Sequence, residues 1–264
     1  MKRAVDLVAD LGEGFGRYRI GDDETLLDVV TSANIACGFH AGDPRIMDAT
    51  VAHCVRRGVA VGAHPGFADI VGFGRRAMDL SVEEVRTDLL YQVGALAAFA
   101  TAHGTRIAHI APHGKLGNLV VVRRDYAEAV ADAVAMLGPD QVVLTQEGEL
   151  AVAARERGIA VGVIGMADRN YLDDGTLVRR TEPNALIHDD DEVVARTVRM
   201  VTDGLVRTIT GTDISVDCDT VLLHGDTTGA VTQARAVRRE LEAAGVDVVP
   251  LREVLAQKTC SGSE

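Results

Sequence analysis

Five histidines of this sequence lie beside glycine, proline or an acidic residue at predicted strand ends, where imidazoles could carry out acid–base or metal chemistry. The segments are CGFHAGD (37–43), GAHPGFAD (62–69), HIAPHGK (109–115) and LLHGD (222–226). A strand that ends in His plus Gly displays its imidazole on a loop that a ligand can approach closely. Several such strands can bring these side chains together at one end of a barrel. The pattern predicts a catalytic site containing His40, His64, His113 and His224, whereas His109, inside an apolar run, is equally well explained as a core residue.

Carboxylates and an amide accompany these histidines. VDLVADLGEGFG places Asp10 at the end of the first predicted strand and Glu13 in a glycine-rich turn, and Asn34 lies in the next strand. No GK[ST] follows the glycines, so the turn is not a Walker phosphate loop. Imidazole and carboxylate ligands suit Zn²⁺, Mn²⁺ or a related ion, but no tight spacing such as HExxH demands one. The candidate metal ligands are Asp10, His40, His64, His113 and His224.

Other polar residues in the same loops could bind an anionic substrate or a phosphate. Two adjacent arginines after GFG suit a carboxylate or phosphate partner, although a solvated charge pair explains them equally well. Asp43, followed by Pro44, is most simply a helix cap. Lys115 follows PHG and is a candidate catalytic residue. The candidate binding residues are Asn34, Asp43, Asp69, Arg75, Arg76, Asn118, Asp168, Arg169, Arg180 and Asp226.

Composition excludes several classes of protein. The net charge of −12 disfavours binding to nucleic acid or an anionic membrane, and 3% aromatic residues leave too few rings for a base-stacking platform. The four cysteines form no CxxC pair, and no apolar run reaches membrane-spanning length. The N-terminal segment does not read as a signal peptide. We therefore expect a cytoplasmic protein with reduced thiols, in which Cys37 is a buried apolar residue rather than a nucleophile.

Short Val- and Ile-rich runs alternate with longer amphipathic stretches, which predicts repeated β-then-α units and a parallel sheet. Seven or eight strands over 264 residues favour a (β/α) barrel over an open doubly wound sheet. We expect one barrel domain over residues 1–258, a hairpin or an excursion within the domain over 205–219, and a disordered tail over 259–264. The predicted strands are 4–9, 32–36, 59–62, 106–110, 141–144, 159–163, 220–223 and 246–249, and the predicted helices are 44–57, 81–103, 124–137, 148–157, 189–203 and 230–244.

A series of motifs resembles one known family. DLGEGFG, ANIACGFHAGDP, GAHPGFAD, GFGRR, YQVGAL, PHG, ADRNY and HGD occur in this order and cover nearly the whole chain. The sequence resembles the LamB/YcsF family, whose members serve as the A subunit of the bacterial ATP-dependent 5-oxoprolinase. The resemblance implies a (β/α) barrel related to the glycoside hydrolase/deacetylase group. It also implies ATP with Mg²⁺, a lactam substrate, and the B and C subunits of 5-oxoprolinase as partners; a homo-oligomer is compatible with it.

The resemblance implies that 5-oxo-L-proline is opened to L-glutamate, but some family positions differ here. Where the family reads KPHGALYN, this chain has Ala111 for the lysine, Lys115 for the alanine and Gly117 for the tyrosine, and Ile164 stands near a family glutamate. Lys115 could replace the missing lysine, or the substrate could be another lactam, amide or carboxylated compound. Two other hypotheses stay open: a metal-dependent amide hydrolase or deacetylase that uses no ATP, and a non-catalytic ligand-binding subunit.

Overall fold

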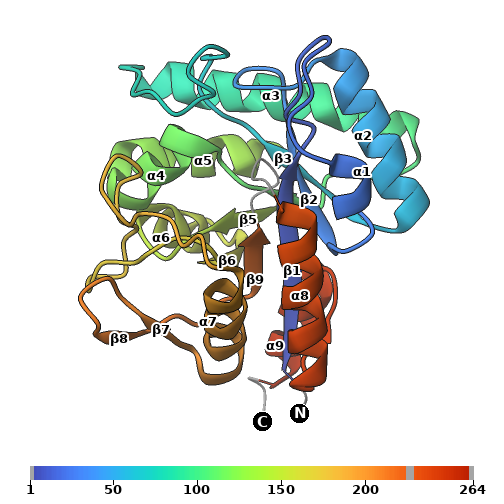
Figure 1. The fold of residues 1–264 in the computed structure, drawn as a ribbon. Helices are drawn as coiled ribbons and strands as arrows, with labels where there is room; N and C mark the ends of the chain where they lie inside the picture. Colours follow the sequence, from blue (N-terminus) through green and yellow to red (C-terminus); the bar gives the residue numbers. More distant parts are fainter. Residues whose placement is uncertain (1–2, 224–228, 262–264) are drawn as a thin grey trace.

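The strands close into a parallel barrel, as the alternating pattern predicts, and not into an open sheet. The structure is a computed structural model that describes residues 3–223 and 229–261. Within these residues seven parallel strands form a ring, which β1 closes by pairing with both β2 and β9. Figure 1 shows β1 running upward through the molecule with helices around the strands. The ring strands are β1 (Ala4–Leu11), β2 (Ser32–Ala36), β3 (Ala60–His64), β4 (His109–Ile110), β5 (Val142–Thr145), β6 (Ala160–Met166) and β9 (Thr220–Leu223).

The eighth predicted strand does not enter the ring. β10 (Asp247–Val248) pairs only with the first residues of β1, at the edge opposite the strand ends that carry the histidines. The predicted hairpin within 205–219 is confirmed, because β7 (Leu205–Arg207) and β8 (Asp213–Ser215) form an antiparallel pair of their own.

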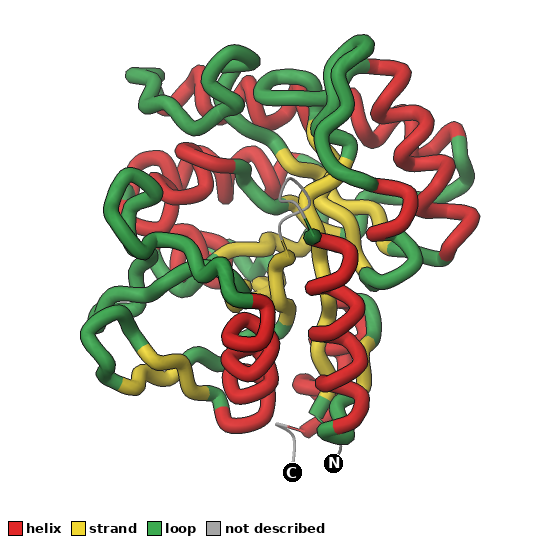
Figure 2. Tube along the Cα trace, in the orientation of Figure 1, coloured by secondary structure: helices red, strands yellow, loops and turns green. Residues whose placement is uncertain are grey.

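Helices cover the outside of the ring, as Figure 2 shows for the red segments around the yellow strands. The predicted capping signals are confirmed. Ser81 and Glu84 form a capping box at the start of α3, and Asp43 accepts hydrogen bonds from the first turn of α2, which ends at Gly58 with φ 69°. Within the described ranges, each helix is too short or too polar to cross a bilayer. The helices that the sequence predicted are observed at α2 (Pro44–Arg57), α3 (Val82–Ala102), α5 (Arg124–Met136), α6 (Glu149–Glu156), α7 (Asp190–Asp203) and α8 (Ala230–Ala243).

Three further helices were not predicted: α1 (Asp23–Leu26), α4 (Gly114–Val122) and α9 (Leu251–Ser261). The α4 sequence contains two glycines and three successive valines, which are weak helix formers, so packing of Leu116 and Val120 into the core decides its conformation. The expectation of a disordered tail is wrong for residues 259–261, which are helical. They continue α9, which buried Leu251 and Val254 anchor to the core. Residues 262–264 lie outside the described residues.

A buried carboxylate joins three strands where the ring closes. Asp6 on β1 accepts hydrogen bonds of 2.7 Å from the hydroxyls of Thr31 and Ser32, at the start of β2, and from Thr220 of β9. All three bonds are short and charge-assisted when Asp6 is ionised. Asp6 therefore holds β1 in register with both neighbours, and the opposite end of the same strand carries Asp10 and leads to Glu13.

Candidate functional site

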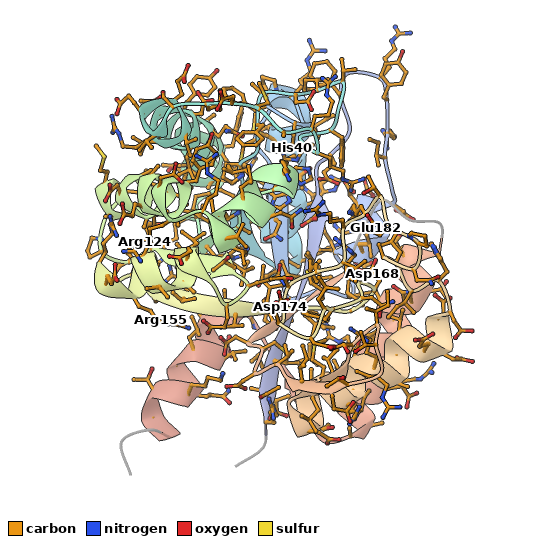
Figure 3. All side chains as sticks on the ribbon, turned by 90° about the vertical axis from the view of Figure 1, so that its left-hand side faces the viewer. His40, Arg124, Arg155, Asp168, Asp174 and Glu182 are labelled. Carbon is orange, nitrogen blue, oxygen red and sulfur yellow. The ribbon has the colours of Figure 1, made fainter. Side chains whose placement is uncertain are left out.

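Four buried side chains meet at the carboxyl ends of four consecutive strands. Glu13 follows β1, His40 lies in the loop after β2, His64 is the last residue of β3, and His113 precedes α4 shortly after β4. One ligand atom from each lies within 4.8 Å of the others. Figure 3 labels His40 among the loops near the upper end of β1. We call Glu13, His40, His64 and His113 the histidine cluster; it is a group that could hold a metal ion.

Backbone carbonyls orient two rings of the cluster. His64 Nδ1 lies 2.6 Å from the carbonyl oxygen of Ala111, and His113 Nε2 lies 2.8 Å from that of Phe73. Because a carbonyl oxygen can only accept, both of these nitrogens carry a proton. The other ring nitrogens, His64 Nε2 and His113 Nδ1, are 2.9 Å apart. These two nitrogens, which are not used on carbonyls, thus face each other.

Burial keeps the imidazoles of His113 and His40 neutral. It lowers the pKa of His113 to about 3, and the nearby His64 ring acts in the same direction. Burial likewise lowers the pKa of His40 well below its ordinary value, with further lowering from His113 and His64. At pH 7 both rings are therefore neutral and can bind a cation, which protonated rings cannot do.

A chain of polar contacts continues from the cluster into the barrel. Asp10 Oδ1 lies 3.4 Å from His64 Nε2 and accepts a 2.9 Å hydrogen bond from the amide of Asn34. The amide oxygen of Asn34 in turn accepts from His109 Nε2 at 2.7 Å. His109 is fully buried, as its apolar context predicts, but it also belongs to this chain of bonds. Sequence reasoning placed Asn34 at the site and set His109 aside; their pairing depends on the strand register.

The glycines beside the histidines leave room for the rings. A Cβ atom at Gly62 would lie 2.0 Å from His109 Nε2, and one at Gly66 would lie 2.8 Å from His40 Nδ1. At Gly74, where φ is +63°, a Cβ would lie 2.7 Å from that of His40 and 2.9 Å from His113 Cδ2. The His-plus-Gly pattern in the sequence therefore reflects close packing of backbone against buried imidazoles.

Comparison with known proteins shows the family of this chain. The family model described as LamB/YcsF family matches residues 5–256. This chain belongs to the LamB/YcsF family. The A subunit of 5-oxoprolinase from Bacillus licheniformis is 47% identical over 92% of this chain and 97% of that protein. The protein of the same name from Bacillus subtilis is 46% identical over 94% of this chain and 97% of its own.

Solved structures agree with the family assignment. The crystal structure of a lactam utilization protein from Thermus thermophilus has a TM-score of 0.88 and 43% identity, covering 93% of this chain and 99% of that one. A deacetylase solved with its substrate is 14% identical, with a TM-score of 0.52 over 97% of this chain and 92% of that one. The second likeness shows a shared fold alone, the deacetylase-like barrel that the resemblance implied.

In this LamB/YcsF chain, several predicted binding residues form local structure and do not join the cluster. Asp43 caps α2 and also accepts from the backbone N–H of Gly16 at 2.8 Å. Asp69 is paired with Arg76, whose guanidinium donates to its carboxylate, and accepts from the N–H of Gly72. The pair holds the loop that contains Phe73 and Gly74 against the cluster, and Arg76 itself is largely exposed.

Arg75 acts electrostatically on the cluster. Its guanidinium carbon is 4.8 Å from the centroid of the Phe73 ring, and its charge contributes to the lowered pKa of both His40 and His113. Phe73, whose carbonyl holds His113 and whose φ is +54°, was not predicted as a site residue. The only sequence signal for it was the GFG triplet at 72–74, which also occurs at 14–16.

The loop after β6 carries Asp168, Arg169 and Arg180. Arg169 is buried and donates to the carbonyl oxygens of Val178 and Ala185, at 2.6 and 3.4 Å, so it ties the loop together. Burial lowers the pKa of Arg169 to about 10, and the charge of nearby Arg180 adds to the effect. Arg180 lines a cleft of about 180 Å³ on this loop. Asp168 is buried beside Arg169 and raises the pKa of that arginine.

Two of the remaining predicted residues lie on α4. Lys115 is half-buried in the first turn of α4, where its N–H donates to Gly74, and Asn118 is exposed on the same helix. His224 and Asp226 lie outside the described residues. Cys37 is buried, and burial raises the pKa of its thiol to about 12, as expected for an inert thiol.

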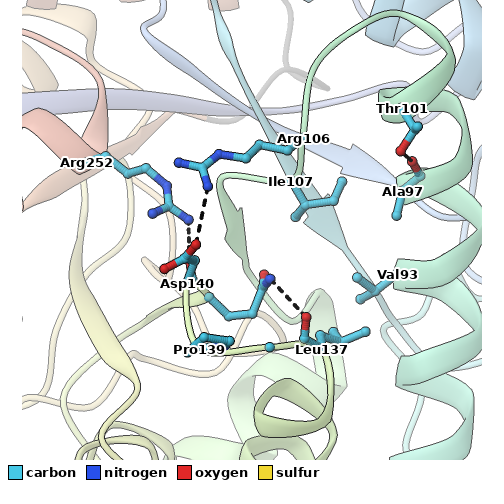
Figure 4. A pocket seen from close by; sticks show the side chains of 11 residues that line it. Val93, Ala97, Thr101, Arg106, Ile107, Leu137, Pro139, Asp140 and Arg252 are labelled. Carbon is cyan, nitrogen blue, oxygen red and sulfur yellow. Dashed lines mark hydrogen bonds and ion pairs between the residues drawn. The ribbon is translucent and has the colours of Figure 1, made fainter.

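A cavity of about 280 Å³ lies away from the cluster. It is lined by α3, by the segments that precede β4 and β5, and by Arg252 of α9 (Figure 4). Arg106 and Asp140 form an ion pair at its edge, 3.6 Å apart. Because its lining residues precede the strands, this cavity lies at the end of the barrel opposite the histidines.

Proposed function

We propose that this chain is the A subunit of an ATP-dependent 5-oxoprolinase, which opens the lactam ring of 5-oxo-L-proline to give L-glutamate. We further propose that it works in the cytoplasm, with the B and C subunits of that enzyme and with Mg²⁺-bound ATP. The full-length likeness to proteins named as this subunit of 5-oxoprolinase, at 46–47% identity, carries the proposal. A buried cluster of one carboxylate and three imidazoles at the active end of the barrel supports it.

The chemistry explains why ATP is needed. A lactam carbonyl carbon is a weak electrophile, and transfer of the γ-phosphoryl group of ATP to the carbonyl oxygen activates it while ADP leaves. Water then adds to the carbon, and the ring C–N bond breaks as the nitrogen takes up a proton, which leaves glutamyl phosphate. A second water releases phosphate and glutamate, so each turnover consumes one ATP and two waters.

The residues near the cluster have properties that suit these steps. One of the carboxylates or imidazoles in or beside the cluster can take a proton from the attacking water, a contribution of about 10²–10⁴-fold in rate for a positioned base. Arg75 can stabilise the phosphoryl charge. Lys115, at the start of α4, can approach from the other side of the same loop and stand in for the lysine that Ala111 replaces.

The test is reconstitution. The chain is combined with the B and C subunits, and glutamate and ADP are measured with 5-oxo-L-proline, with and without ATP. We expect equal amounts of both products, and none when ATP or a partner is omitted. His113→Asn should lower kcat by roughly a hundredfold or more. The matched control, His188→Asn at an exposed histidine, should leave kcat unchanged.

Two results would overturn the proposal. Hydrolysis of 5-oxo-L-proline or another amide by the chain alone, without ATP, would favour the amide hydrolase hypothesis. Tight lactam binding without turnover in the complete assembly would favour a ligand-binding subunit. Calorimetric titration of lactams with and without ATP distinguishes these outcomes further.

A further inference from the structure

One ring nitrogen of His64 and one of His113 face each other. The other nitrogen of each ring donates to a backbone carbonyl, so the 2.9 Å contact is made by the two remaining nitrogens, which can share one proton or bind one cation. In a buried site a cation beside both nitrogens satisfies the two polar atoms together. The surrounding backbone holds them in this arrangement, because Ala111 and Phe73 determine both ring orientations.

Two carboxylates face the same pair of nitrogens. Glu13 Oε1 lies 3.6 Å from His113 Nδ1, and Asp10 Oδ1 lies 3.4 Å from His64 Nε2. All four side chains are at least nine-tenths buried. The group therefore concentrates acceptor atoms and negative charge in a space shielded from water, which is the arrangement that a bound cation requires.

We propose that His64 Nε2, His113 Nδ1 and the Glu13 carboxylate bind one divalent first-row transition-metal ion. For metal–ligand distances of about 2.0–2.1 Å, the 2.9 Å and 3.6 Å separations correspond to angles at the ion of about 90° and 120°. Both angles are ordinary for such ions. Imidazole ligands favour Zn²⁺, Mn²⁺ or Fe²⁺ over Mg²⁺ and Ca²⁺, which prefer oxygen.

The ring planes decide which histidines can share the ion. The rings of His64 and His113 are inclined at 79°, so their in-plane lone pairs can converge on one point. The rings of His40 and His113 are stacked 3.7 Å apart and inclined by only 8°. An ion in the plane of one would lie well outside the plane of the other. His40 is therefore not a ligand beside His113 in this arrangement, although its Nε2 is near the others.

His40 instead positions the carboxylate. Its Nε2 lies 3.3 Å from Glu13 Oε1 and can donate to it. Among the described residues, its Nδ1 is buried with no hydrogen-bond partner, so the contact with Glu13 is the polar interaction that orients the ring. A residue that orients a metal-binding carboxylate typically contributes about 10–100-fold to metal affinity. We assign His40 this positioning role.

The metal proposal does not rest on the proposed reaction, although both involve the histidine cluster. It is tested on the isolated chain, without ATP, lactam or partner subunits. Failure to bind metal would leave the 5-oxoprolinase proposal standing, and failure of the reconstituted assay would leave the metal site standing.

The experiment is metal binding to chelator-treated protein. Zn²⁺ and Mn²⁺ are titrated against a competing chelator, with bound metal measured by elemental analysis and Co²⁺ absorption reporting the ligands. We expect one ion per chain and a higher Tm with Zn²⁺ than with Mg²⁺. His64→Ala and His113→Ala should each lower affinity by about a hundredfold or more, whereas His40→Gln should keep one ion per chain with about 10–100-fold weaker binding. The control His188→Ala should bind as the wild type does.

Because a histidine variant could fail to fold, the wild-type protein supplies a second measurement. Nitrogen chemical shifts of the His64 and His113 rings should change on adding one equivalent of Zn²⁺. A protonated ring shared between these two histidines, unaffected by Zn²⁺, would overturn the proposal. So would an absence of stoichiometric metal and of any rise in Tm, or equal affinity in folded His113→Ala and wild type.

Discussion

Replacing Asp6 by asparagine should change how stability depends on pH. Burial, opposed by hydrogen bonds from Ser32, Thr220 and Thr31, raises the pKa of Asp6 from 3.8 to about 6 in the folded protein. The folded state therefore holds this proton up to a higher pH than the unfolded chain does. The stabilisation is fully present below about pH 4 and is lost as pH rises through about 6. At 1.36 kcal/mol per pKa unit, the loss amounts to about 3 kcal/mol.

The assay is urea unfolding of both proteins at intervals from pH 4 to pH 7. Other groups titrate in the same range, so the informative quantity is the wild-type free energy of unfolding minus that of Asp6→Asn. This difference should fall by about 3 kcal/mol across the range.

Asp213→Asn is the control with the opposite shift. Hydrogen bonds from Arg199 lower the pKa of exposed Asp213 to about 2, so its contribution is lost only as pH falls toward that value. The wild-type minus Asp213→Asn difference should stay nearly constant above pH 4. A wild-type minus Asp6→Asn difference that is equally constant would refute the argument that burial dominates the three hydroxyl donors at the barrel seam.

Three further changes test the site. Gly62→Ala should lower the free energy of unfolding by about 1–3 kcal/mol in urea, because its Cβ would overlap His109; unchanged stability would contradict the close packing. Arg75→Gln should weaken binding of ATP or another anion about tenfold or more by calorimetry, as expected for a lost charged hydrogen bond, and equal affinity would remove Arg75 from the site. Lys115→Ala should abolish glutamate formation, and Ala111→Lys in that background should restore part of it; a fully active Lys115→Ala protein would show that no lysine is needed in this loop.

Local sequence patterns were sufficient for the order and type of most elements. Period-two and period-3.6 apolar patterns, with caps such as Ser81 and stops such as Gly58, determine where a strand or helix begins and ends. The range 32–36 was predicted with its observed bounds. Helix α4 was missed because its glycines and valines disfavour a helix locally, and its conformation depends on contacts with the rest of the barrel.

The candidate site, too, could be predicted from the sequence only in part. The sequence alone determined that histidines end neighbouring strands, because His-plus-Gly pairs after apolar runs are visible in one dimension. Only the tertiary structure decided that Glu13 joins three of them, that Asp69 and Arg76 pair with each other, and that His109 bonds to Asn34. Those contacts depend on barrel closure and strand register, which bring together residues up to 100 positions apart. A ring's protonated nitrogen is likewise determined by which carbonyl it meets, and that partner comes from another loop.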